Sequence, residues 1–107
     1  MSSFKLHDLE SRIEERARAS AEVSYTRRLL DGGVGHCARK LGEESIETVI
    51  AAVGEDRERL IAEAADLIYH LLVLLRARGI ALAEVEAALG ARTGQSGLQE
   101  KTSRQRS

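Results

Sequence analysis

The segment from Asp56 to Arg78 restricts the possible folds of this chain more than any other part of it. Its apolar residues include Ile61, Ile68 and the run Leu71–Leu75, and they are spaced so that they occupy nearly the whole circumference of an α-helix. A helix that is apolar on most sides has to be buried on most sides. Because a chain of 107 residues offers only a few short helices to cover it, we expect a helical bundle that is completed by homodimerisation.

The composition also favours an all-α fold. The chain contains no proline, and aromatic residues make up 3% of it, whereas β-sheets favour aromatic residues and their turns favour proline. Ala, Leu, Glu and Arg, which are good helix formers, are abundant instead. The length leaves no room for two domains, so we expect a single helical domain over residues 1–107.

Apolar spacing and capping residues predict four further helices. They are expected at about residues 6–21, 25–30, 34–53 and 82–89. Ser24 is expected to cap the second of them, and Asp56 to cap the long apolar helix. Residues 94–107 are rich in Gly, Ser, Gln and charged residues, so taken alone they predict a disordered polar tail.

The charge balance and the remaining composition argue against several classes of partner. Sixteen basic and seventeen acidic residues give a formal net charge of −1, which provides no attraction for nucleic acid or an anionic membrane. The apolar run Leu71–Leu75 is too short to span a membrane, and the first ten residues lack the apolar core of a signal peptide. The single Cys37 excludes an internal disulfide and a cysteine-based zinc site. We therefore expect a cytoplasmic protein.

Two pairs of acidic residues on the third and fourth helices are the main candidates for a functional site. Glu44 and Glu47 are three residues apart, as are Glu63 and Asp66, so each pair projects from one helix face. Two antiparallel helices with a short connection would bring the pairs opposite each other. Asp66 directly precedes the apolar segment, where burial of an unpaired carboxylate is costly. A divalent cation would remove that cost, and oxygen ligands favour Mg²⁺ or Mn²⁺.

The spacing alone leaves ordinary structural explanations open. Acidic pairs at this spacing also occur on solvated helix faces beside Lys or Arg. Lys40 shares a face with Glu44 and could contact phosphate or only neutralise that carboxylate. His70, four residues after Asp66, could support a metal site, act as a general base, or be an interface histidine with ordinary hydrogen bonds.

Ordinary structural roles are also considered for Cys37, Arg27, Arg28 and Tyr25. Cys37 fits a small core residue, because no activating motif surrounds it. Arg27 and Arg28 could face a substrate or only solvent. Tyr25 could pack in the core or stack on a base, and packing is the simpler explanation.

Three segments of the sequence resemble the phosphoribosyl-ATP pyrophosphatase family. Its members catalyse the second step of histidine biosynthesis and belong to the all-α nucleotide pyrophosphatase superfamily. The three segments are Ser24-Tyr25-Thr26, Lys40-Leu41-Gly42-Glu43-Glu44 with Glu47, and Glu63 with Ala65-Asp66-Leu67-Ile68-Tyr69-His70 and the apolar run that follows. The acidic pairs alone indicate only the superfamily. The narrower assignment rests on Ser-Tyr-Thr and on the C-terminal residues Arg92, Ser96-Gly97-Leu98, Glu100, Lys101 and Arg104.

The resemblance implies an all-helical homodimer that hydrolyses phosphoribosyl-ATP to phosphoribosyl-AMP and pyrophosphate with Mg²⁺, or with Mn²⁺ as an alternative. The implied metal ligands are Glu44, Glu47, Glu63 and Asp66. We further expect Glu44 or Glu47 to act on the attacking water, and the basic residues Lys40, Lys101 and Arg104 to bind the phosphates. The chain departs from the family pattern at Cys37 and Leu41, which concerns packing rather than chemistry. It is too short, and has too few thiols, to include the zinc-binding cyclohydrolase domain that some relatives carry.

Two alternatives remain at this point. One is a house-cleaning pyrophosphatase of the same superfamily that acts on (d)NTPs, since the acidic pairs are common to both. The other is a non-enzymatic helical dimerisation module whose carboxylates are only solvated.

Overall fold

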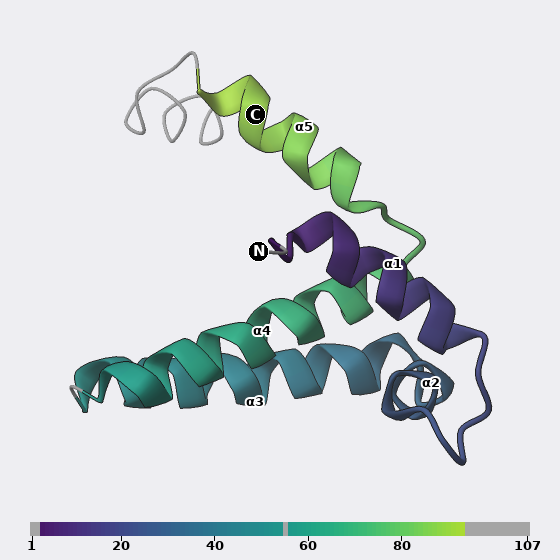
Figure 1. The fold of residues 1–107 in the computed structure, drawn as a ribbon, viewed down its shortest axis with the longest axis horizontal. Coiled ribbons are helices and arrows are strands. Elements are labelled where there is room, and N and C mark those ends of the chain that lie inside the picture. The colour runs from purple at the N-terminus through teal and green to yellow at the C-terminus, as the bar shows by residue number, and fades with distance from the viewer. Residues whose placement is uncertain (1–2, 55, 94–107) are drawn as a thin grey trace.

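The structure is a computed structural model that describes residues 3–54 and 56–93. The described part is all-helical and contains no strand, as predicted (Figure 1). Its helices are α1 (Leu6–Ala17), α2 (Tyr25–Asp31), α3 (Gly33–Val53), α4 (Arg57–Ala77) and α5 (Leu82–Arg92). None of them is both long enough and apolar enough to cross a membrane. The predicted tail, residues 94–107, lies outside the described residues.

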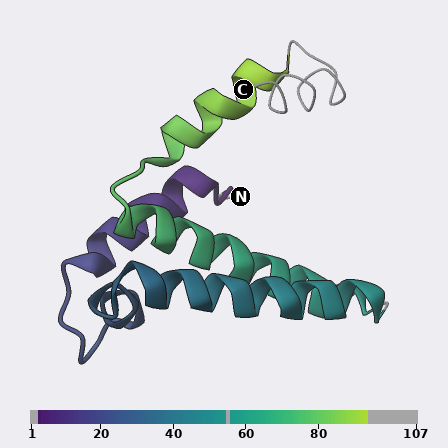
Figure 2. The same ribbon diagram turned by 180° about the vertical axis from the view of Figure 1, so that it is seen from behind.

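The two long helices α3 and α4 form an antiparallel hairpin that is the body of the molecule. They lie side by side along their length in both views, with α1 across the C-terminal part of α4 and α2 at the start of α3 (Figures 1 and 2). Helix α5 projects away from the hairpin beyond α1. The buried core sits where α1, α2 and the hairpin meet, and it consists of Ile13, Leu29, Cys37, Leu72, Val73 and Leu82.

Within the described part of the chain, much of the hairpin is uncovered. On α4 the apolar side chains of Ile61, Ile68 and Leu71 are exposed, although the sequence calls for burial of this helix on most sides. In the C-terminal half of α3, four apolar side chains are also exposed, namely Ile46, Val49, Ile50 and Val53. We call these seven residues the open apolar face of the hairpin.

The helix caps follow the prediction closely. The backbone N–H of Arg27 donates to Ser24 Oγ at 3.0 Å, and that of Arg59 donates to Asp56 Oδ1 at 3.0 Å. Each cap satisfies one of the donors that a helix start leaves without a partner. Gly79, with φ of +70°, follows the end of α4 in a conformation that favours glycine.

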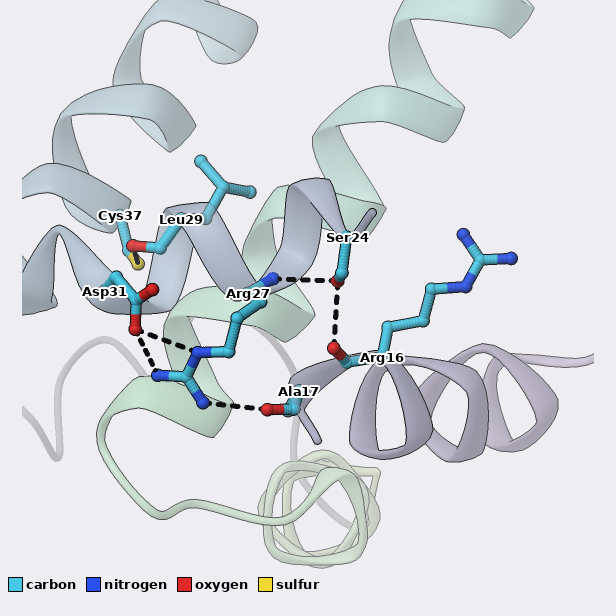
Figure 3. A network of polar contacts seen from close by, with 7 residues as sticks. All are labelled: Arg16, Ala17, Ser24, Arg27, Leu29, Asp31 and Cys37. Carbon is cyan, nitrogen blue, oxygen red and sulfur yellow. Dashed lines mark hydrogen bonds and ion pairs between the residues drawn. The ribbon is translucent and has the colours of Figure 1, made fainter. Parts of the chain in front are cut away.

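Helix α1 is shorter than predicted, because it ends at Ala17 rather than near Ala21. Its last carbonyls are bound by side chains from the next helix (Figure 3). Ser24 Oγ donates to the Arg16 carbonyl at 2.9 Å, and Arg27 Nη1 donates to the Ala17 carbonyl at 2.8 Å. These contacts close the end of α1 and turn the chain into α2, and no local sequence pattern signals them.

Candidate metal centre

The hairpin brings three of the four candidate carboxylates together. Glu44 on α3 and Glu63 and Asp66 on α4 each place one oxygen within 4.8 Å of the other two. We call these three residues the carboxylate cluster. The short connection between α3 and α4 makes the helices antiparallel, so the acidic pairs lie at the same level of the hairpin.

Thr48, which is not among the predicted site residues, fixes this level of the hairpin. Its hydroxyl lies between the two helices, donating to the Glu44 carbonyl at 2.8 Å and lying 3.3 Å from the Glu63 carbonyl. The side chain therefore links the backbones of two residues that carry cluster carboxylates. The available sequence signal was its position four residues after Glu44, where a threonine hydroxyl can reach back to a helical carbonyl.

Two oxygens of the cluster are buried without a partner. Glu44 Oε2 and Glu63 Oε2 have no hydrogen bond among the described residues and almost no contact with solvent. Buried polar atoms normally have a hydrogen-bond or metal partner, because an unpaired one is costly. A cation would supply that partner, so this donor set of carboxylate oxygens fits a hard divalent ion.

The electrostatics of the cluster also favour a bound cation. Burial raises the pKa of Glu44 above its usual value, and the charge of Glu47 raises it further. Burial also raises the pKa of Glu63, again with Glu47 as the next cause. Partial desolvation and like charges thus make the ionised cluster unfavourable without a counter-ion. Glu47 itself is exposed and stands beside the cluster rather than in it.

The position of Asp66 differs from the expectation. The sequence placed this carboxylate at the edge of a buried segment, but Asp66 is exposed, whereas Glu44 and Glu63 are half-buried. Among residues 3–54 and 56–93, no neighbouring element buries the Asp66 side chain. The desolvated members of the cluster are therefore the two glutamates.

The basic candidates are only partly placed by the structure. Lys40 is half-buried one turn before Glu44 and forms no ion pair within the described residues, so it does not neutralise that carboxylate. Lys101 and Arg104 lie outside the described residues.

The arginines of α2 have a structural role. Arg27 forms an ion pair with Asp31 at 2.7 Å in addition to its bond to the Ala17 carbonyl. Arg28 Nε donates to the Ala21 carbonyl at 2.5 Å. Both guanidinium groups thus brace the segment between α1 and α2 (Figure 3 for Arg27).

Cys37 is a core residue. It is buried, its Sγ donates to the Leu29 carbonyl at 3.2 Å, and burial raises the pKa of the thiol. A thiol in such surroundings is a poor nucleophile.

An aromatic group adjoins the cluster along α4. The rings of Tyr69 and His70 meet edge to face with centroids 5.0 Å apart, and Tyr25 lies 6.4 Å from Tyr69 and 6.2 Å from His70. The hydroxyls of Thr26 and Tyr69 are 2.6 Å apart. The Ser24-Tyr25-Thr26 segment is thereby anchored on α4 one turn beyond Asp66. Tyr25 packs on one side and is 50% exposed.

A separate hollow lies away from the cluster. A groove of about 530 Å³ runs between α1 and the connection from α4 to α5, and residues such as Glu10, Ile13 and Leu82 line it. It includes none of the candidate carboxylates. We assign the chemistry to the cluster rather than to this groove, because the unpartnered buried oxygens are in the cluster.

Comparison with known proteins gives consistent matches over almost the whole chain. The family described as phosphoribosyl-ATP pyrophosphohydrolase matches residues 6–93. The chain is 65% identical over 104 residues to phosphoribosyl-ATP pyrophosphatase 1 of Bradyrhizobium diazoefficiens, which covers 97% of this chain and 98% of the relative. It is 58% identical over 106 residues to phosphoribosyl-ATP pyrophosphatase of Nitrobacter winogradskyi, with 99% and 91% covered. It is 52% identical over 105 residues to phosphoribosyl-ATP pyrophosphatase of Rhizobium meliloti, with 98% of each covered.

Proposed function

Since the chain belongs to the phosphoribosyl-ATP pyrophosphohydrolase family, we propose that the carboxylate cluster on α3 and α4 is the metal-binding part of its active site. The protein is a hydrolase that converts phosphoribosyl-ATP to phosphoribosyl-AMP and pyrophosphate in histidine biosynthesis. This assignment takes precedence over both a house-cleaning (d)NTP pyrophosphatase and a non-enzymatic dimerisation module. A cytoplasmic location suits such an enzyme.

The observation that carries the metal proposal is the pair of buried oxygens without a partner, Glu44 Oε2 and Glu63 Oε2. Together with Asp66, and with Glu47 beside them, these residues would hold Mg²⁺ or Mn²⁺. When bound, such an ion stabilises the negative charge that develops on phosphate oxygens as the bond between the α- and β-phosphates breaks.

The side chains of this chain would perform the remaining steps. Hydrolysis joins the oxygen of a water molecule to phosphorus on one side of the bridge while the bridging P–O bond breaks. We propose that Glu44 or Glu47 orients this water and accepts its proton, because a carboxylate positioned at the cluster can act as a general base. Lys40, one turn before Glu44, would pair with a phosphate. We propose the same role for Lys101 and Arg104.

A homodimer is part of the proposal, and the open apolar face supports it. Seven exposed apolar side chains on the two long helices provide apolar surface that a second copy of the chain could bury. Sedimentation velocity at micromolar concentration should give a dimer, and Ile50→Asp should shift it toward monomer. Val23→Asp is the matched control, because Val23 is exposed but lies in the α1–α2 connection. A monomeric parent protein would refute the dimer.

The metal site is tested by Glu63→Gln, which keeps the shape of the side chain and removes its charge. We expect Mg²⁺ to raise the melting temperature of the parent protein in a concentration-dependent way. The variant should lose this response and most of its Mg²⁺-dependent release of pyrophosphate from phosphoribosyl-ATP. Glu58→Gln, in the first turn of the same helix, should change neither. An unaltered Glu63→Gln would refute the assignment, and a dNTP panel assayed in parallel tests the substrate.

A further inference from the structure

We propose that His70 is a positioning residue whose Nε2 accepts a hydrogen bond from an O–H group held at the carboxylate cluster. The group would be a water molecule or a hydroxyl of the nucleotide. The inference rests on the proposed function of the cluster.

The starting observation is that His70 Nε2 is buried and has no partner. The side chain is 7% exposed, and the atom has no hydrogen bond among the described residues. The only other side-chain atoms of this kind in the described part of the chain are Glu44 Oε2 and Glu63 Oε2. Such atoms are rare in native proteins and call for an explanation by a missing partner.

The other ring nitrogen of His70 fixes what Nε2 can do. Nδ1 lies 2.9 Å from the backbone carbonyl of Asp66. A carbonyl cannot donate, so Nδ1 carries the hydrogen, and Nε2 of the neutral ring is an acceptor. All three unpartnered atoms are thus acceptors that lack a donor.

The surroundings of His70 place this acceptor near the cluster and hold it still. His70 follows Asp66 by one helical turn, about 6 Å along the axis. Its Nδ1 is bonded to the backbone of Asp66, a residue whose carboxylate belongs to the cluster, so the ring lies beside that residue. Tyr25 and Tyr69 both meet the ring edge to face and restrict its rotation.

A bound O–H group would satisfy this acceptor without displacing any cluster oxygen. Groups that hydrogen-bond to the ligands of a metal orient those ligands, and their removal typically lowers affinity or activity about 10- to 100-fold. The oxygen-rich cluster would retain the hard cation, and His70 would orient the group beside it.

Two substitutions distinguish the roles of the two ring nitrogens of His70. His70→Asn keeps a donor at the position of Nδ1, so it can retain the bond to the Asp66 carbonyl, but it has nothing at the position of Nε2. His70→Gln reaches the position of Nε2 and can place its amide oxygen there. His7→Gln is the control, because His7 is an exposed residue of α1.

The test uses Mn²⁺ as the probe, with electron paramagnetic resonance to measure binding and pulsed measurements to detect nitrogen near the ion. In the parent protein we expect weak coupling to one imidazole nitrogen. Coupling with Mn²⁺ alone identifies a water molecule, and coupling only after addition of phosphoribosyl-AMP identifies a nucleotide hydroxyl. His70→Asn should remove the coupling and lower Mn²⁺ affinity or kcat about 10-fold or more. His70→Gln should recover most of the loss, and His7→Gln should change nothing.

Three results would overturn the inference. Strong coupling would make His70 a direct metal ligand, and absence of coupling with and without nucleotide would leave Nε2 without a role at the cluster. Equal losses in His70→Asn and His70→Gln would show that the ring matters for packing only. In each case loss of Mn²⁺ binding in Glu63→Gln would show that the proposed metal site still stands, whereas a parent protein that binds no Mn²⁺ refutes both.

Discussion

Ser24 is a buried helix cap with two hydrogen bonds, and replacing it by alanine should destabilise the fold more than loss of an ordinary cap. Its Oγ accepts from the Arg27 N–H at 3.0 Å and donates to the Arg16 carbonyl at 2.9 Å, and the residue is only 2% exposed. Loss of an N-cap typically costs about 1 kcal/mol. Loss of the second bond adds about 1 kcal/mol, and burial prevents water from replacing either partner.

The expected decrease in the free energy of unfolding for Ser24→Ala is therefore about 2–3 kcal/mol. Asp56→Ala is the matched control, because Asp56 caps α4 with one bond of the same length and is exposed. It should cost about 1 kcal/mol, since water can reach the Arg59 N–H.

Urea and thermal unfolding followed by circular dichroism at 222 nm measure both variants, in metal-free buffer and at equal protein concentration. For a domain of this size, about 4 °C of melting temperature is lost per kcal/mol. Ser24→Ala should thus melt about 10 °C lower than the parent protein and Asp56→Ala about 4 °C lower. Equal losses in the two variants would show that neither the bond to the Arg16 carbonyl nor the burial of Ser24 contributes to stability, and would refute this prediction.

Three further predictions concern the core, the pH dependence and the surface. Leu29→Ala should lower the free energy of unfolding by about 2–5 kcal/mol in a urea titration, because Leu29 is 1% exposed and its removal leaves a cavity. Burial raises the pKa of Glu44 and Glu63, so the folded metal-free chain retains these protons to higher pH than the unfolded chain. Their contribution to stability is therefore largest below the unfolded value of 4.5 and declines as pH rises through the folded values. Urea midpoints measured across that range should fall less steeply in Glu63→Gln. Glu14→Gln removes the surface ion pair between Glu14 and Arg76, whose charged atoms are 2.6 Å apart. It should change the melting temperature little in a calorimetric scan, because exposed ion pairs contribute little to stability.

The order and type of the helices could be predicted from the sequence because the signals are local. Apolar spacing, the caps Ser24 and Asp56, and the glycines after α3 and α4 all act within a few residues. The end of α1 could not be predicted in the same way. Its carbonyls are bound by Ser24 and Arg27, eight and ten residues further along the chain, and such contacts depend on how the helices pack.

In the candidate site, too, some features follow from local sequence signals and others depend on how the helices pack. The spacing of the acidic pairs predicts that Glu44 faces Glu63 and Asp66, because this follows from helix geometry and a short connection, but it does not predict that Glu47 stands outside the cluster. It does not predict which of them is buried. Asp66 is exposed and Glu44 and Glu63 are desolvated, since burial depends on the neighbouring helix rather than on the apolar residues that follow in sequence. The bond between the hydroxyls of Thr26 and Tyr69, 43 residues apart, has no local signal at all.

The described part of the chain concentrates its unsatisfied chemistry in one place. Its unpartnered buried side-chain atoms are two carboxylate oxygens and one imidazole nitrogen, all acceptors and all within about two turns of α4 or directly opposite on α3. A fold selected for stability alone would replace or pair such groups, because each one favours unfolding. These unpaired groups lie close together on the hairpin, next to the anchored Ser24-Tyr25-Thr26 segment. Such an arrangement is expected of a binding site whose ligands supply the missing hydrogen-bond donors and the positive charge. The near-neutral total charge of the chain conceals this local deficit of positive charge.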